Sequence, residues 1–311
     1  LRLVPFIIGG TWLTHLFGGS AGREGVAVQI GATVSHTVGQ KLNLKKHQTT
    51  LIVIGMAAGF AGLFQTPIAA TFFALEVMFV GQLVYPALIP ALIAAFIASG
   101  TSHFLGLEKF QVFVSDAFAF HFANFAKLMI IGIIFGLTGS LFAKGLAYLK
   151  TFMSEKMVNP YLRIFIVGIV LSILLLLCHG GRYAGLGTNL IAASFSGQTI
   201  YLYDFIAKLL FTIVTLSVGF QGGEVTPLFS IGASLGIVLA GLFHMPVILV
   251  AALGYAAVFG SATNTLLAPI LIGCEVFGFN YFPYFFIVCA FAYFFNFDQS
   301  IYGKQLKKIQ M

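Results

Sequence analysis

The sequence predicts an all-α polytopic membrane protein, and three observations support this fold class. Of its 311 residues, 59% are hydrophobic and only 8% are charged, and the mean hydropathy is +1.01. A soluble domain carries about a quarter charged residues. Some apolar stretches are long enough to cross a bilayer as helices, which takes about 20 residues. Others are shorter or are interrupted by glycine or proline, so we expect many short, tilted and broken helices.

The expected helices follow from these stretches. Two segments are long enough to span a membrane without interruption: 125–148 and 162–178. Five others are shorter or broken: 26–38, 51–64, 68–80, 225–243 and 247–259. Irregular backbone at membrane depth is tolerated where it lines a site inside the protein, and such broken helices are typical of transporters. We therefore expect a ligand site near the middle of the membrane.

The composition also excludes several classes. The formal charge of +7 comes from 16 basic and 9 acidic residues scattered along loops, so we expect it to set membrane topology, with no nucleic-acid partner. The histidines show no metal-binding spacing, and no cofactor or metal is expected. The cysteines lie in apolar runs without CxxC spacing, as small core residues do: Cys178, Cys274 and Cys289.

Both ends of the chain lie close to apolar segments. It starts inside an apolar run at Leu1 without the pattern of a signal peptide, so we expect that the N-terminal part of a longer protein is missing. We expect one integral membrane domain and no soluble domain after the last apolar segment.

The chain contains an internal repeat. The segment 55–77 overlies 254–276 without a gap, and 8 of 23 positions are identical. At nearly the same offset, 22–32 overlies 223–233. Two matched blocks in the same order indicate duplication. We place the remainder of the first repeat and the following connection in residues 1–123, and the second repeat with a terminal tyrosine-bearing helix in residues 124–311.

Loop charges suggest that the two halves have opposite orientations. The first half carries three lysines between its matched blocks, whereas the second half carries no lysine or arginine there. Cytoplasmic loops are enriched in these residues. We expect the first loop and the C-terminus to be cytoplasmic, and the inverted repeats to share a ligand site at their interface. The lysines concerned are Lys41, Lys45, Lys46, Lys304, Lys307 and Lys308.

Four acids lie within apolar or glycine-rich segments, where an ionisable group is a candidate functional residue. Glu76 and Glu275 occupy the same position in both repeats, which favours a shared structural role such as capping a helix. Glu24 and Glu224 each lie in a glycine-flanked break before an apolar helix. A helix start is an anion site, which such a carboxylate could occupy itself and leave when protonated. The alternatives are a fixed ion pair of Glu24 with Arg23 and a capping role for Glu224.

These residues carry a resemblance to a known family. "GREGVAVQIG", "GGEVTPLFSIGA" and "IYGKQL" resemble the GREGP-x-VQIG, GGxFxP and terminal-helix tyrosine motifs of the CLC chloride channels and proton-coupled anion exchangers. The resemblance implies an all-α inverted-repeat fold, and it implies that Glu24 is a gating glutamate above backbone-amide anion sites. It also implies a homodimer with one pathway per subunit, in the cell membrane (a bacterial inner or plasma membrane).

Departures from the motifs point to one branch. Val26 replaces the proline of GREGP, and Val77 stands where chloride exchangers carry a second proton-path glutamate. The additional Glu224 is similar to the CLC-F branch of fluoride/proton antiporters. The resemblance then implies that Glu24 carries the proton, with Glu224 as its inner partner. The expected anion ligands are the backbone amides and hydroxyls of Gly22, Arg23, Gly25, Val225, Thr226 and Tyr302.

Two other functions remain open. A chloride channel or chloride/proton exchanger of the same family is the first alternative, and Glu224 argues against it. The second is an intramembrane serine protease, because Ser20 and Ser234 fit GxSxG, with His179 or His244 as a partner. A chain with 35 glycines produces such matches by chance.

A terminal Tyr such as Tyr302 would, taken alone, be an ordinary membrane-interface residue.

Overall fold

The computed structural model describes residues 1–114, 121–303, 305 and 306, and these residues fold into helices without a named strand. The all-α prediction is confirmed. The predicted cytoplasmic lysines Lys304, Lys307 and Lys308 lie outside the described residues. The α-helices are α1 (Leu3–Leu16), α2 (Glu24–Lys41), α3 (Gln48–Phe64), α4 (Pro67–Glu76), α5 (Leu88–Phe104), α6 (Phe122–Lys156), α7 (Pro160–Leu177), α8 (Thr188–Ser196), α9 (Asp204–Ser217), α10 (Val225–Phe243), α11 (Val247–Thr263), α12 (Leu267–Phe277) and α13 (Phe282–Phe294).

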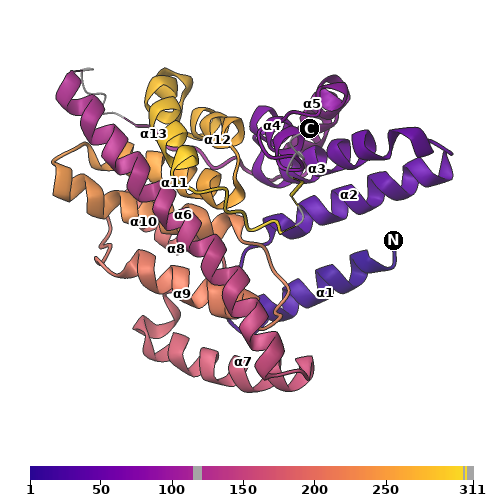
Figure 1. The fold of residues 1–311 in the computed structure, drawn as a ribbon, viewed down its shortest axis with the longest axis horizontal. Coiled ribbons are helices and arrows are strands. Elements are labelled where there is room, and N and C mark those ends of the chain that lie inside the picture. Colours follow the sequence, from indigo (N-terminus) through magenta and orange to yellow (C-terminus); the bar gives the residue numbers. More distant parts are fainter. Residues whose placement is uncertain (115–120, 304, 307–311) are drawn as a thin grey trace.

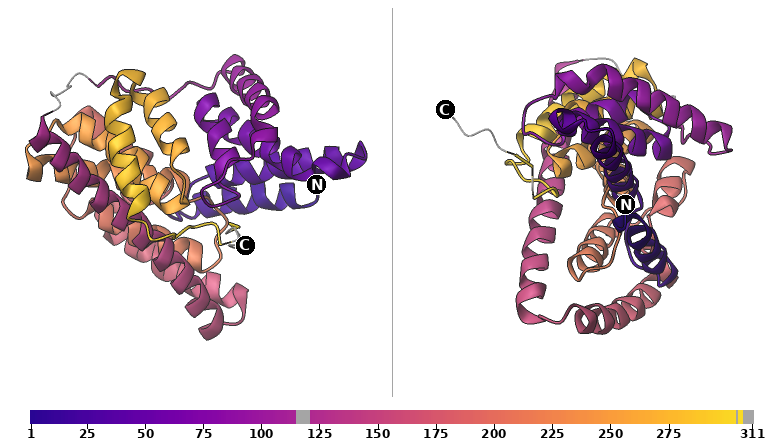
Figure 2. Two further views of the ribbon diagram at one scale, coloured as in Figure 1. Left: turned by 45° about the horizontal axis from the view of Figure 1, so that its top comes forward. Right: turned by 90° about the vertical axis from the view of Figure 1, so that its right-hand side faces the viewer.

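The helices form two groups that lie side by side. Helices α1 to α5 make one group, and α8 to α13 with the long α6 make the other (Figures 1 and 2). Within the described residues, four helical stretches are long and apolar enough to cross a membrane. They are Tyr85–Phe104, Phe122–Lys156, Pro160–Leu177 and Val225–Phe243. Gln48–Phe64, Pro67–Glu76 and Val247–Thr263 are shorter, as predicted for these broken segments. The segment 225–243 was predicted among the short ones, but it forms one continuous 19-residue helix because its glycines pack inside the helix without breaking it.

The equivalent helices α3 and α11, one in each repeat, end in the same way. Gln65 ends α3 in the left-handed conformation, with φ at 55°, and Asn264 ends α11 with the same φ. Left-handed backbone stops a helix, and Asn is among the residues that accept it best. In the first repeat, Pro67 then starts α4 at a position where its missing N–H has no helical partner to lose. The two repeats thus share their backbone geometry as well as their residues.

Glycines allow the helices of each repeat to pack closely. A Cβ on Gly31 of α2 would overlap the carbonyl oxygen of Gly55 on α3, and a Cβ on Gly232 of α10 would overlap that of Gly254 on α11. No side chain fits between these backbones. Such contacts between small residues drive helix association where lipid removes the hydrophobic force. The equivalent pairs hold α2 on α3 and α10 on α11.

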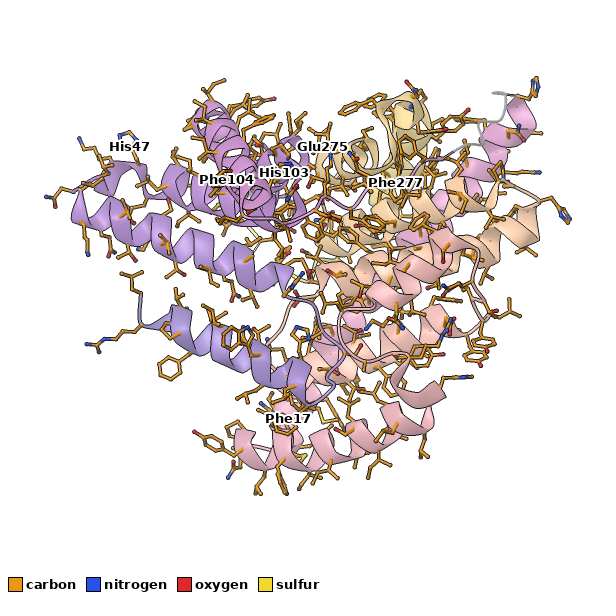
Figure 3. All side chains as sticks on the ribbon, turned by 180° about the vertical axis from the view of Figure 1, so that it is seen from behind. Phe17, His47, His103, Phe104, Glu275 and Phe277 are labelled. Carbon is orange, nitrogen blue, oxygen red and sulfur yellow. The ribbon has the colours of Figure 1, made fainter. Side chains whose placement is uncertain are left out.

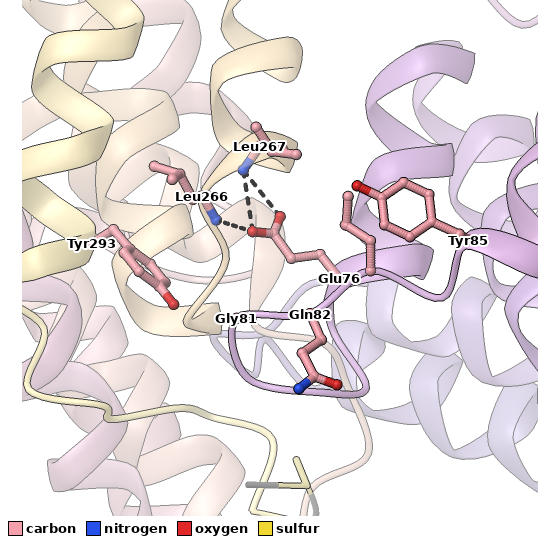
Figure 4. Close-up of a pocket in the computed structure, with 8 residues that line it drawn as sticks. Glu76, Gly81, Gln82, Tyr85, Leu266, Leu267 and Tyr293 are labelled. Atoms are coloured by element: carbon pink, nitrogen blue, oxygen red, sulfur yellow. Dashed lines mark hydrogen bonds between the residues drawn. The ribbon is translucent and has the colours of Figure 1, made fainter. Parts of the chain in front are cut away.

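The two repeats cap each other's helices. Both carboxylate oxygens of Glu76, at the end of α4, accept hydrogen bonds at the start of α12, from the amides of Leu266 at 2.6 Å and Leu267 at 3.0 Å (Figure 4). In return, Glu275 of α12 accepts from the amide of Ala69 at 2.7 Å. Glu275 lies where α12 meets the first group (Figure 3). The predicted shared capping role is confirmed.

Candidate anion site at two helix starts

The two glycine-rich breaks lie against each other at the centre of the fold. The Gly22 amide donates to the Gly223 carbonyl at 2.6 Å, and the Gly223 amide donates to the Gly22 carbonyl at 2.7 Å. Gly22 and Gly223 occupy the same repeat position, so this antiparallel bridge joins equivalent residues. From it, α2 and α10 extend to opposite sides (Figure 1). The bridge therefore brings the starts of both helices together.

Close approach explains why the bridge consists of glycine. A Cβ on Gly22 would overlap a carboxylate oxygen of Glu24, and a Cβ on Gly223 would lie 2.7 Å from the Gly25 amide nitrogen. A side chain at position 223 would displace the backbone at the start of α2, and one at position 22 would displace the Glu24 carboxylate. The glycines answer a packing requirement, and neither has a positive φ.

Glu24 begins α2 and is buried, with 3% of its surface exposed. Its Oε2 atom accepts hydrogen bonds from the amide of Arg23 at 2.9 Å and from the amide of Thr226 at 3.3 Å. Thr226 lies in the first turn of α10, where unpaired N–H groups and the helix dipole favour negative charge. The carboxylate of the first repeat thus lies on the helix start of the second.

Arg23 contributes its backbone and not its charge. Its side chain is exposed, and it forms no ion pair with Glu24. Among the described residues, the one ion pair joins Arg182 to Asp204 at 2.7 Å. The fixed Arg23–Glu24 ion pair considered from the sequence is therefore wrong.

Glu224 is the N-cap residue of α10, yet its side chain makes no capping hydrogen bond. The structural cap considered from the sequence is wrong in this respect. A Cβ on Gly25 would lie 3.5 Å from Glu224 Oε2, so this carboxylate lies beside the start of α2. It also lines a cavity of about 480 Å³ together with Gln29, Lys150 and Ser300. Glu24 and Glu224 therefore flank the bridge, one buried and one facing a cavity.

The first turn of α10 holds a buried hydroxyl without a partner. Thr226 is 5% exposed, and its Oγ1 atom makes no hydrogen bond within the structure. Large majorities of buried polar groups are hydrogen-bonded, so an unpaired one needs an explanation. Val225, which precedes it, is buried and apolar. The unpaired hydroxyl and the Thr226 amide, which Glu24 occupies, lie in the same turn.

Tyr302 lies beyond α13, next to the first repeat. Its ring packs edge-on against Phe73 of α4, with ring centres 6.2 Å apart. It also lines a small apolar cavity with Val28 and Met56. No hydrogen bond joins its hydroxyl to Glu24 or Thr226 in this conformation. The structure therefore brings Tyr302 near α2 and α4 without showing it as a ligand.

The residues considered for a protease have other partners. Ser234 Oγ donates to the Ser230 carbonyl at 2.7 Å, and His179 Nε2 lies 2.7 Å from the Tyr203 hydroxyl. His244 ends α10 in the left-handed conformation. Ser20 Oγ accepts from Lys208 Nζ at 2.9 Å. The sequence analysis missed Lys208, although a lysine inside the apolar run of 205–218 was a visible signal.

Fold and site together define the class: an all-α membrane protein in which two broken-helix repeats meet at a buried carboxylate. Residues 1–296 match the family described as voltage gated chloride channel. A chloride/fluoride channel protein of Pseudomonas syringae pv. tomato is 36% identical over 98% of this chain and 69% of its own length. The chain therefore belongs to the voltage gated chloride channel family, whose members are ion channels and transporters. The protease interpretation is wrong.

Solved structures place the chain more closely within this family. It is similar to the crystal structure of a CLC-type fluoride/proton antiporter, with 59% identity, a TM-score of 0.97, and coverage of 99% of this chain and 78% of that chain. A slow cyanobacterial Cl⁻/H⁺ antiporter shares the fold, with 21% identity, a TM-score of 0.78, and coverage of 95% of this chain and 72% of that chain. The predicted resemblance is confirmed.

We predict that Gly223→Ala destabilises the protein and Gly241→Ala does not. The new methyl group at position 223 would lie 2.7 Å from the Gly25 amide nitrogen, whereas position 241, on the same α10, has nothing within 4 Å. Overpacking costs about 1–3 kcal/mol, and Ala in an open helix position gains about 0.5–1 kcal/mol over Gly. Thermal unfolding of both purified variants in detergent measures the difference. Equal midpoints would contradict the packing argument.

Proposed function

We propose that this protein exports fluoride in exchange for protons, with Glu24 as gate and proton carrier. The observation that carries the proposal is the Glu24 carboxylate on the Thr226 amide, beside a buried hydroxyl that has no partner. An anion that enters this site must replace the carboxylate, because both need the same donors. The similarity to a fluoride/proton antiporter and to a chloride/fluoride channel protein supports fluoride as the anion.

The gate works by competition for a helix start. Ionised Glu24 satisfies the α10 amide and closes the site. Protonation removes its negative charge and weakens its charge-assisted hydrogen bond. The side chain then leaves and fluoride takes its place on the α10 start. Proton uptake and fluoride entry are linked in this way, since the side chain leaves when it is protonated and fluoride enters only after it has left.

Fluoride requires several strong donors, because it is small and strongly hydrated and loses that hydration on entry. The proposed donors lie around the bridge. They are the backbone amides of Gly22, Arg23, Gly25 and Val225, the amide and hydroxyl of Thr226, and the hydroxyl of Tyr302 after a movement toward the site.

Glu224 is the proposed inner partner of Glu24. It lies beside Gly25 and faces the cavity, so it is placed to pass a proton between water and the gate. Val77, at the position of the second proton-path glutamate, is apolar and 5% exposed. With no carboxylate at that position, the proton travels by the route of the anion. Two carboxylates that share one proton would alternate as its holder.

We also propose a homodimer in the cell membrane of a bacterium, either inner or plasma. The outward faces of α5 and α13 carry exposed apolar side chains, which suit lipid or a second subunit. They include Ile89, Ile93, Ile97, Phe282 and Phe286. Each subunit would contain a complete pair of helix starts, so the pathway does not depend on the partner.

We predict that fluoride leaves proteoliposomes faster than chloride by about tenfold or more, a difference of about 1.4 kcal/mol. The physical reason is the number of hydrogen-bond donors at the α10 start, since the small, strongly hydrated fluoride ion gains more from them than chloride does. Ion-selective electrodes record both effluxes from vesicles made with the complete protein. Comparable rates would favour the alternative, a chloride channel or chloride/proton exchanger.

Glu24→Gln should abolish proton movement driven by a fluoride gradient. Glutamine resembles the protonated side chain in shape but cannot carry a proton. A pH-sensitive dye inside the vesicles measures the proton flux, and Glu155→Gln, an exposed acid on α6, is the control. Proton flux at the wild-type rate in Glu24→Gln would exclude this residue as the carrier.

For Glu224→Gln we expect the loss of coupled turnover in a protein that stays folded. The side chain makes no capping hydrogen bond, so stability should change by about 0.5 kcal/mol or less. Size-exclusion chromatography and thermal unfolding check the fold, and the fluoride and proton assays check turnover. A well-folded variant with normal coupled exchange would remove Glu224 from the proton route.

A further inference from the structure

A fully buried lysine lies behind the segment that leads to Glu24. Lys208 of α9 has 0% exposure, and its ammonium donates to Ser20 Oγ at 2.9 Å. It also donates to the backbone carbonyls of Tyr183 at 3.0 Å and Gly185 at 2.7 Å. A lysine ammonium has three N–H donors. All three are therefore used, each by a neutral acceptor.

Among the residues that the structure describes, no acid forms an ion pair with this lysine. Asp204 lies one turn earlier on α9, but its carboxylate accepts from Arg182 Nη2 and from the Tyr183 hydroxyl, each at 2.7 Å. Burial of an unpaired cation is costly. An ionisable residue within a membrane protein is retained where it serves a function. The groups that accept hydrogen bonds from Lys208 indicate which part of the protein it stabilises.

Those acceptors belong to the approach to the gate. Ser20 lies two residues before the bridge glycine Gly22, and its amide donates to Thr215 Oγ1 on α9 at 3.2 Å. Its hydroxyl lies 2.9 Å from Thr212 Oγ1. The Gly185 amide donates to the Gly19 carbonyl at 3.0 Å. The segment 18–22, α9 and the connection between α7 and α8 thus meet around one ammonium group.

We propose that Lys208 is a positioning residue for the gate, which holds segment 18–22 so that Gly22 pairs with Gly223 and Glu24 reaches the start of α10. This inference rests on the proposed function of Glu24. Without the lysine, Ser20 loses a charged donor and two carbonyls lose their common partner. The approach segment then moves more freely, and Glu24 leaves the α10 start without first taking a proton. Fluoride passes during these unprotonated openings.

Lys208→Met tests this, because methionine keeps the length of the side chain and removes the three donors. The number of fluoride ions moved per proton should rise by about twofold or more, since the released gate becomes more populated. Ser20→Ala should raise the same ratio by a smaller amount. Ile213→Ala is the control: Ile213 is buried on α9, and its side chain packs beside Gly145 of α6. It should lower thermal stability and leave the ratio at the wild-type value.

A second measurement does not depend on proton coupling. Hydrogen exchange of the amides of residues 18–25 should be faster in Lys208→Met and Ser20→Ala than in the wild type and in Ile213→Ala. If wild-type protein moves fluoride without protons, the proposed function fails, and the exchange data still decide the role of Lys208. If Lys208→Met does not fold, Ser20→Ala decides it. Wild-type exchange and an unchanged ratio in a folded variant would overturn the inference, as would the same change of ratio in Ile213→Ala.

Discussion

The backbone bridge between Gly22 and Gly223 is the contact on which the site depends. Its two hydrogen bonds, of 2.6 and 2.7 Å, place the start of α2 beside the start of α10. Only there can the carboxylate of one repeat reach the first amides of the other. Glycine at position 223 lets the two backbones approach, and glycine at position 22 leaves room for the Glu24 carboxylate, so the local sequence allows the repeats to meet here. The buried carboxylate, the free hydroxyl and the cavity follow from it.

The surrounding contacts keep the two repeats in register around this bridge. Glu76 and Glu275 each cap a helix of the other repeat, so neither α4 nor α12 has its start satisfied by its own half. A carboxylate on a helix start is thus used three times. At α4 and α12 the two capping carboxylates fix the structure. At α10 the carboxylate comes from Glu24, which follows a glycine-rich break at the start of α2. In the proposed mechanism this interaction is reversible.

Buried polar side chains on α9 hold the segment 18–22, which leads to Glu24, in place. Glycine-rich backbone has little intrinsic preference for one conformation, and the last hydrogen bonds to α1 come from the amides of Gly18 and Gly19. At Ser20, which follows, the partners are Lys208, Thr212 and Thr215 from one face of α9. In the proposed mechanism only the Glu24 side chain moves. A fixed backbone behind it keeps the motion confined to that side chain.

The sequence by itself determined the fold class, the duplication, the family and a shared capping role for Glu76 and Glu275, because hydropathy, glycine spacing and repeated acids are local patterns. It also pointed to Glu24 and Glu224 through their glycine-flanked breaks. Tertiary structure alone decided that Glu24 bonds to Thr226 and not to the Arg23 side chain, that Glu224 faces a cavity without capping α10, and that Ser20 is tied to Lys208. These contacts join residues of separate segments, and a linear pattern holds no information on which buried group will find which partner.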